Sequence, residues 1–299
     1  MNQLTRHILR AGLAVAITSI ATLATAQTAF TSSYKGGSTA SCGTTYNIRG
    51  AEPTASGKYP VYVHIGGTGE SYTSNWAMAA VNAMAAKGFV AASIEYDNGS
   101  FGTCSTIGTR AKCIFDSSKA TSAIQTLCAR AKADCSKGIV TGGLSQGSII
   151  SVLSKNYDSR IRASMGQGAG ATYTAAYNLS SCIANGNHTQ SGDRIRIING
   201  QTDMFVGGTV ISAGNSGALV TGKTCATGST SCLNSNGSGW LVVRSTEVSD
   251  LDADHCFMGY GGVIGVQCSG ALVDPIYQSG SKAWALPATT EWLKSFVTP

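Results

Sequence analysis

The stretch IVTGGLSQGSII, residues 139–150, joins two apolar runs through a serine that stands between two glycines. Gly143, Ser145 and Gly147 give the spacing G-x-S-x-G. Where a strand turns sharply into a helix, the residue at the turn is strained and its side chain is exposed above the sheet edge. The residues two positions away must be small, because strand and helix crowd there. The stretch therefore predicts a strand over 138–143, an exposed Ser145 and a helix that follows at once.

Apolar runs and helical patterns alternate on both sides of this stretch. Further strands are predicted over residues 60–67, 89–96, 161–166, 194–199 and 240–245. Helices are predicted between Ser74 as N-cap and Gly88 as C′ residue, near 117–131, over 146–156 and over 288–297. This alternation predicts an α/β fold with a mostly parallel central sheet and helices on both faces. The Ser-, Thr- and Gly-rich residues 27–58 are expected to form an extended segment or a short edge hairpin.

The first 26 residues have the composition of an export signal. Arg6 and Arg10 precede an apolar stretch of small residues, and Ala24-Thr25-Ala26 offers an A-x-A cleavage site. We expect residues 1–26 to be a cleaved signal peptide and residues 27–299 to form a single domain. An uncleaved membrane anchor is the alternative, and the short apolar region argues against it. The expected location is secreted or periplasmic, with no membrane contact after cleavage.

The ten cysteines agree with export, because an even count in an exported chain predicts disulfide bonds. Nearness in sequence suggests four pairs and leaves a long-range fifth, although connectivity stays open: Cys104–Cys113, Cys128–Cys135, Cys225–Cys232, Cys256–Cys268 and Cys42–Cys182. A zinc site is poorly supported, since no C-x-x-C pair occurs and the chain has only four histidines. Lys and Arg are scattered and the net charge is +6, so no nucleic-acid partner is expected.

Polar residues at the carboxyl ends of the predicted strands suggest a catalytic set, because such sheets carry their active groups there. Ser145 needs a base, and His255 fits best because it follows the last strand and precedes the terminal helix. Asp203 comes directly after the penultimate strand and is the expected partner of that histidine. Asp252 and Asp254 are rivals, but they lie too near His255 in sequence to reach around its ring.

Two backbone N–H groups are expected to form an oxyanion hole. Gln146 follows the serine at the start of a helix, and Thr68 lies in the glycine loop HIGGTGE, residues 64–70. Gly67 is the alternative second donor. The stretch GQGAG, residues 166–170, mimics a dinucleotide-binding fingerprint but lacks the proper offset of the third glycine and a clear following helix.

The motifs HIGGTG, GLSQG, NGQTD and ADHC together resemble the α/β-hydrolase superfamily. More loosely, they resemble its secreted esterase and dienelactone-hydrolase-like branches. The resemblance covers about residues 60–297 and implies an eight-stranded type of sheet with a Ser-His-Asp triad. It assigns Ser145 as nucleophile, His255 as general base and acid, and Asp203 as the orienting acid.

These observations predict an exported serine hydrolase that cleaves carboxylic esters, without a cofactor and as a monomer. The expected substrate is a small or polymer-linked ester, because the insertions 170–193 and 206–239 are polar and rich in small residues rather than a long apolar lid. Two alternatives stay open. One is a serine peptidase or amidase on the same fold, and the other is an exported binding protein on a hydrolase scaffold that has lost its chemistry.

Overall fold

The computed structural model describes residues 26–298, apart from 171, 174–176, 261–267 and 269–271. The predicted signal peptide, residues 1–26, therefore lies outside the described residues except for its last residue. Within the described part of the chain, no helix has both the length and the apolar character needed to cross a membrane.

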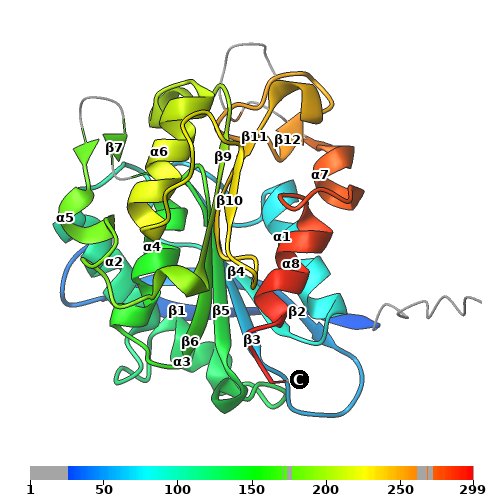
Figure 1. Ribbon diagram of the computed structural model, residues 1–299. Helices are drawn as coiled ribbons and strands as arrows, with labels where there is room; N and C mark the ends of the chain where they lie inside the picture. The colour runs from blue at the N-terminus through cyan, green and yellow to red at the C-terminus, as the bar shows by residue number, and fades with distance from the viewer. Residues whose placement is uncertain (1–25, 171, 174–176, 261–267, 269–271, 299) are drawn as a thin grey trace, which may run out of the picture.

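Strands of the described residues form one nine-stranded sheet (Figure 1). Its spatial order is β1 (Gln27–Gly36), β2 (Thr44–Pro53), β4 (Val90–Ile94), β3 (Val61–Ile65), β5 (Ile139–Leu144), β6 (Ile161–Gln167), β9 (Ile195–Gly200), β11 (Gly239–Val243) and β10 (Ser231–Leu233). The strands from β4 to β11 run parallel, whereas β1, β2 and β10 pair antiparallel at the two edges. All six predicted core strands and the edge hairpin are thus confirmed.

Helices cover both faces of this sheet, as predicted (Figure 1). One face carries α2 (Cys104–Phe115), α3 (Ala123–Cys128), α4 (Gln146–Leu153), α5 (Ser180–Ile183) and α6 (Val210–Thr221), and the other carries α1 (Asn75–Ala86), α7 (Pro275–Ser279) and α8 (Leu286–Lys294). The central strands are buried on both faces, which explains why they read as continuous apolar runs.

Short elements complete the described chain around this core. They are the two-residue strands β7 (Thr172–Tyr173), β8 (Tyr177–Asn178), β12 (Gly259–Tyr260) and β13 (Leu272–Val273), and the 3₁₀ helices η1 (Cys135–Lys137), η2 (Ser154–Asn156), η4 (Gly192–Arg194), η5 (Met204–Val206) and η6 (Ser245–Glu247).

The helix predicted near 117–131 is wrong in its extent. The segment before it, where the sequence predicted no helix, forms α2, and only α3 lies inside the predicted range. Asp116 ends the first helix and accepts hydrogen bonds from the Ser118 amide at 3.0 Å and its hydroxyl at 2.6 Å. Such a local side-chain bond competes with helical pairing, so a new helix starts only at the N-cap Ser122.

The region 206–239, expected as an insertion, instead contributes to the core. Its helix α6 packs against β9 and β11, and glycines allow the close approach. A Cβ atom on Gly217 would lie 2.6 Å from the Cβ atom of Trp240. The small residues that looked like a polar loop are therefore those that a tightly packed helix needs.

Five disulfide bonds link the described cysteines, and three of them match the predicted pairs: Cys128–Cys135, Cys225–Cys232 and Cys256–Cys268. The other two are Cys42–Cys113 and Cys104–Cys182, so the predicted pairs Cys104–Cys113 and Cys42–Cys182 are wrong. Cys104 and Cys113 occupy the same helix, α2, where nine residues of helical rise separate them by about 13 Å. A disulfide needs Cα atoms closer than about 7 Å.

Digestion of the unreduced protein with trypsin tests this pairing, because Arg110 and Lys112 lie between Cys104 and Cys113. Mass spectrometry should find the peptide of Cys104 linked to that of Cys182. Replacing both cysteines by serine should lower the free energy of unfolding by about 2–5 kcal/mol. A peptide linking Cys104 to Cys113 would contradict the assignment.

His64 points into the core from β3, where its Nδ1 atom lies 3.1 Å from the Tyr62 hydroxyl. Burial lowers the pKa of His64 to about 4. The folded state therefore binds fewer protons than the unfolded state, and the stability contributed above pH 6.5 is lost as the pH falls toward 4. For this residue the loss reaches about 2 kcal/mol at pH 5.

A His64→Gln variant should lose less stability than the wild type between pH 7.5 and pH 5, by about 2 kcal/mol. Urea unfolding at both pH values measures the difference. The comparison between variants isolates His64 from Asp254, whose pKa burial raises to about 6 and whose contribution has the opposite sign. An identical pH dependence in both proteins would refute the lowered pKa of His64.

Candidate active site

Ser145 occupies a strained turn between β5 and α4, at the carboxyl edge of the sheet. Its backbone φ is +53° with ψ of −123°, a conformation that side-chain-bearing residues rarely adopt. Its amide donates to the carbonyl of Gln167 at 2.8 Å, and its side chain does not cap the helix that follows. The geometry is the strand–turn–helix elbow that the sequence predicts.

Gly143 and Gly147 allow this turn to exist. A Cβ atom on Gly147 would lie 2.1 Å from the carbonyl oxygen of Ile65, and one on Gly143 would lie 2.3 Å from the carbonyl oxygen of Gly147. Both contacts are with backbone, which cannot move aside. The elbow is therefore pressed against the end of β3, and that contact brings Ser145 beside the glycine loop.

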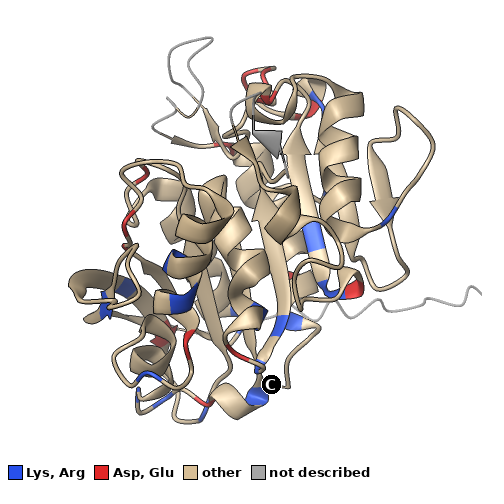
Figure 2. Cartoon of the chain, turned by 90° about the vertical axis from the view of Figure 1, so that its left-hand side faces the viewer, with Lys and Arg blue, Asp and Glu red and all other residues tan. Residues whose placement is uncertain are grey.

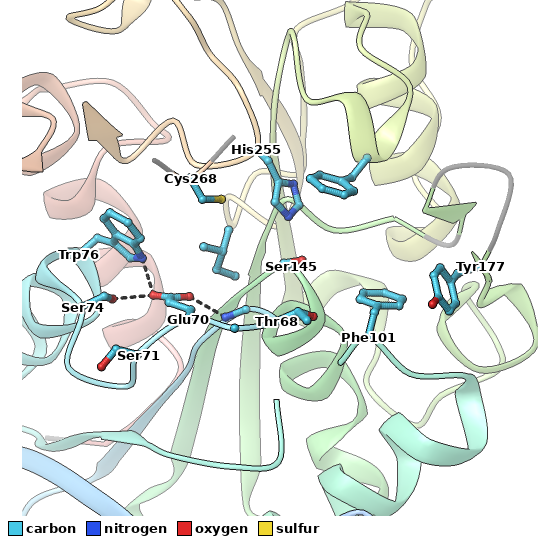
Figure 3. Close-up of a pocket in the computed structure, with 14 residues that line it drawn as sticks. Thr68, Glu70, Ser71, Ser74, Trp76, Phe101, Ser145, Tyr177, His255 and Cys268 are labelled. Carbon is cyan, nitrogen blue, oxygen red and sulfur yellow. Dashed lines mark hydrogen bonds between the residues drawn. The ribbon is translucent and has the colours of Figure 1, made fainter. Parts of the chain in front are cut away.

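His255 and Asp203 meet at the same edge, although 52 residues separate them in sequence. The Nδ1 atom of His255 lies 2.7 Å from Oδ2 of Asp203, and both side chains are almost fully buried. The other carboxylate oxygen of Asp203 accepts the amide of Phe205 at 2.9 Å. This pairing leaves the Nε2 side of the imidazole directed toward the cleft that contains Ser145 (Figure 3).

The rival carboxylates have other partners. Asp252 accepts the hydroxyl of Thr202 at 2.6 Å, and Asp254 accepts the amide of Cys256 at 2.7 Å. Cys256, which directly follows His255, forms a disulfide bond with Cys268.

Two residues that the sequence interpretation did not assign hold the imidazole ring. A Cβ atom on Gly168, within GQGAG, would lie 2.6 Å from Cε1 of His255, so only glycine leaves room for the ring. The ring of Phe205 also packs against the imidazole, with centroids 4.6 Å apart. Gly168 thus follows the end of β6 and leaves space for His255, and a single glycine after a strand carried no sequence signal of that use.

Of the three predicted oxyanion donors, Gly67 is already engaged, because its amide donates to Oε2 of Glu70 at 2.6 Å. The amides of Thr68 and Gln146 have no acceptor among the described residues. Gly67, Thr68 and Ser145 line the same cleft, and a Cβ atom on Gly67 would lie 3.1 Å from that of Ser145. Two amides are therefore available beside the serine.

A buried polar network holds the side chain of Gln146. The Gln146 side chain accepts from Arg110 at 2.5 Å, and its Nε2 atom lies 3.3 Å from the hydroxyls of both Thr68 and Tyr96. Arg110 is itself buried, and it also donates to the carbonyl of Ser100 at 3.0 Å. The side chain of Gln146 thus connects the elbow to the glycine loop.

The cleft above Ser145 has a volume of about 590 Å³ and a mainly apolar lining. Four aromatic side chains contribute to it: Trp76, Phe101, Tyr177 and Phe205. Phe101 and Tyr177 form an edge-to-face pair with ring centroids 4.8 Å apart, visible beside Ser145 in Figure 3. Their places in sequence gave no sign of this convergence, because each comes from a different element.

Few of the residues that line the cleft are charged. Figure 2 shows Lys and Arg spread over several elements and interspersed with Asp and Glu. Among the described residues lining the cleft, Glu70 is the only carboxylate.

No protein-family model and no curated protein sequence matches the chain. Solved structures similar to it include esterase Est22, with 13% identity, a TM-score of 0.42 and coverage of 66% of this chain and 70% of that one. A putative dipeptidyl aminopeptidase IV from Bacteroides ovatus has 18% identity and a TM-score of 0.42 over 60% of this chain and 29% of that one. Hypothetical protein PA2218 from Pseudomonas aeruginosa has 12% identity and a TM-score of 0.38, over 61% and 54% of the two chains.

The strand order and the elbow identify the fold without help from these similarities. Eight strands follow the order β1-β2-β4-β3-β5-β6-β9-β11, with β10 added at the edge, and the elbow stands at the end of the central strand β5. The chain has the α/β-hydrolase fold.

Proposed function

We propose that the protein is an exported serine hydrolase that cleaves carboxylic esters through an acyl-enzyme intermediate. The observation that carries the proposal is the 2.7 Å contact between His255 and Asp203 beside the strained turn of Ser145. A serine hydroxyl becomes a useful nucleophile only with an oriented base next to it. The five disulfides support export, since such bonds persist in oxidising compartments.

In the proposed reaction, Ser145 Oγ attacks the ester carbonyl while His255 Nε2 takes its proton. The tetrahedral oxyanion accepts hydrogen bonds from the amides of Thr68 and Gln146, which contribute about 3 kcal/mol each to lowering the barrier. The C–O bond to the alcohol breaks and His255 returns the proton to the leaving oxygen. Water, deprotonated by the same imidazole, then attacks the acyl group, and the bond to Ser145 Oγ breaks as His255 returns the proton to that oxygen and the acid leaves. Asp203 holds the imidazole orientation throughout.

The lining of the cleft suggests the kind of ester. Its aromatic walls favour an apolar acyl or alcohol group, and its volume suits a small ligand. Tyr177 and Phe205 keep 37% and 39% of their surface exposed, so the cleft is open enough for an ester carried on a polymer. Amides have poorer leaving groups than esters, so amide cleavage is the weaker activity in this proposal.

A fluorophosphonate probe should label the native protein at Ser145, with loss of fluoride, and should not label Ser145→Ala. Asp203→Asn should lower kcat by about 10⁴-fold, because the imidazole loses its required tautomer. Ser105→Ala, which removes an exposed serine of α2, should label like the wild type. In-gel fluorescence and peptide mapping measure the labelling by the probe, and initial rates of ester hydrolysis measure kcat. A native wild type that stays unlabelled would favour the non-catalytic binding protein instead.

For p-nitrophenyl esters, we expect kcat/KM to rise with acyl length only up to about six carbons. Each buried CH₂ contributes about 0.8 kcal/mol, but only while the chain stays inside the cleft. Initial rates on the acetate, butyrate, hexanoate and palmitate esters test this, with the matching p-nitroanilides to detect amidase activity. A marked preference for palmitate, or for the anilides, would contradict the proposed substrate class.

A further inference from the structure

Glu70, the last residue of the glycine loop, places a carboxylate in the lining of the cleft. Oε1 accepts the Ser74 hydroxyl at 2.6 Å and the indole N–H of Trp76 at 2.5 Å, while Oε2 accepts the Gly67 amide at 2.6 Å (Figure 3). Ser74 is the N-cap of α1 and Trp76 lies in its first turn. The carboxylate therefore ties the glycine loop to the beginning of a buried helix.

The backbone on both sides of Thr68 is fixed by further bonds. The side-chain amide of Asn98 donates to the carbonyls of Gly67 at 2.7 Å and Glu70 at 2.8 Å, and the Gly69 amide donates to the carbonyl of Asn98 at 2.8 Å. The Gly67 carbonyl and the Thr68 N–H belong to one planar peptide group, in which they point in opposite directions. Directing that carbonyl toward Asn98 thus aims the Thr68 N–H to the other side.

From these contacts we propose that Glu70 is a positioning residue of the oxyanion hole. Its carboxylate holds the Gly67 amide away from the reacting carbonyl and fixes the loop in the orientation where Thr68 is the donor. The inference rests on the proposed ester hydrolysis. It means that the Glu70 side chain determines which of two neighbouring amides, Gly67 or Thr68, binds the oxyanion.

The chemistry of the group suits this role. Three donors converge on the two oxygens, and an ionised carboxylate is a pure acceptor that can satisfy all of them. Burial raises the pKa of Glu70, whereas the hydrogen bonds from Ser74, Gly67 and Trp76 and the nearby His255 act in the opposite direction. Glutamine has one acceptor oxygen in place of two. It must therefore lose either the bond from the Gly67 amide or the bonds from Ser74 and Trp76.

Glu70→Gln should lower kcat on p-nitrophenyl butyrate by about 10- to 100-fold and leave KM within about twofold, because a misplaced donor weakens only the transition state. Binding of a trifluoromethyl ketone, which forms an oxyanion on Ser145, should weaken by a similar factor. Trp76→Phe, which removes one of the three donors and keeps an aromatic ring, should show a smaller loss of the same kind.

The matched control is Glu95→Gln, which removes a carboxylate that accepts two hydrogen bonds from Asn47 outside the cleft. This variant should keep the wild-type kcat. Amide hydrogen exchange, followed by NMR, should show the Gly67 amide protected in the wild type and faster in Glu70→Gln. Thermal unfolding of each variant checks that the fold is retained.

The outcomes separate the two proposals. Unlabelled wild type with no ester hydrolysis would refute the proposed function. An active wild type whose Glu70→Gln variant keeps kcat within twofold would refute the role of Glu70 alone. A variant that loses kcat and raises KM in step with a large drop in melting temperature would also refute it, because that pattern reports a general loss of structure.

Discussion

The close contact between the Ser145 turn and the end of β3 is the constraint on which the rest of the site depends. Side-chain atoms at Gly143 or Gly147 would collide with backbone oxygens at little more than 2 Å, so this contact exists only because both positions are bare. It places the serine and the glycine loop in one cleft, and the first residue of α4 follows the serine directly. The strain at Ser145 is held by the two buried strands and the helix that surround it.

Polar groups that would be costly in a core are organised around this contact. Asp203, Gln146 and Arg110 are buried, and each has a charged or hydrogen-bonding partner. Because a buried polar group without a partner costs about 1–3 kcal/mol, these networks hold their members in defined positions. The same principle extends into the cleft, where the carboxylate of Glu70 accepts three hydrogen bonds.

The sequence was informative wherever a pattern is local. Continuous apolar runs predicted the six core strands, and glycine spacing predicted the elbow. Placement after strand ends selected Asp203 and His255 as neighbours, and in the structure their side chains lie 2.7 Å apart. The presence of α2 and α6 and the extent of α3 were missed, because an Asx turn and small helix residues imitate loops in a pattern of apolar periodicity. Two disulfide pairs were predicted wrongly, because a helix holds Cys104 and Cys113 far apart although they are near in sequence.

By itself, the sequence determined the α/β layering, the strand–turn–helix unit and the edge at which polar residues gather, since each follows from periodicity or from the size of single residues. Only the tertiary structure decided which amide of the glycine loop is occupied, which four aromatic rings line the cleft of the serine, and that Gly168 lies against the imidazole. These features join residues from separate elements. Their contacts depend on how the elements pack in three dimensions, which no local pattern of residues records.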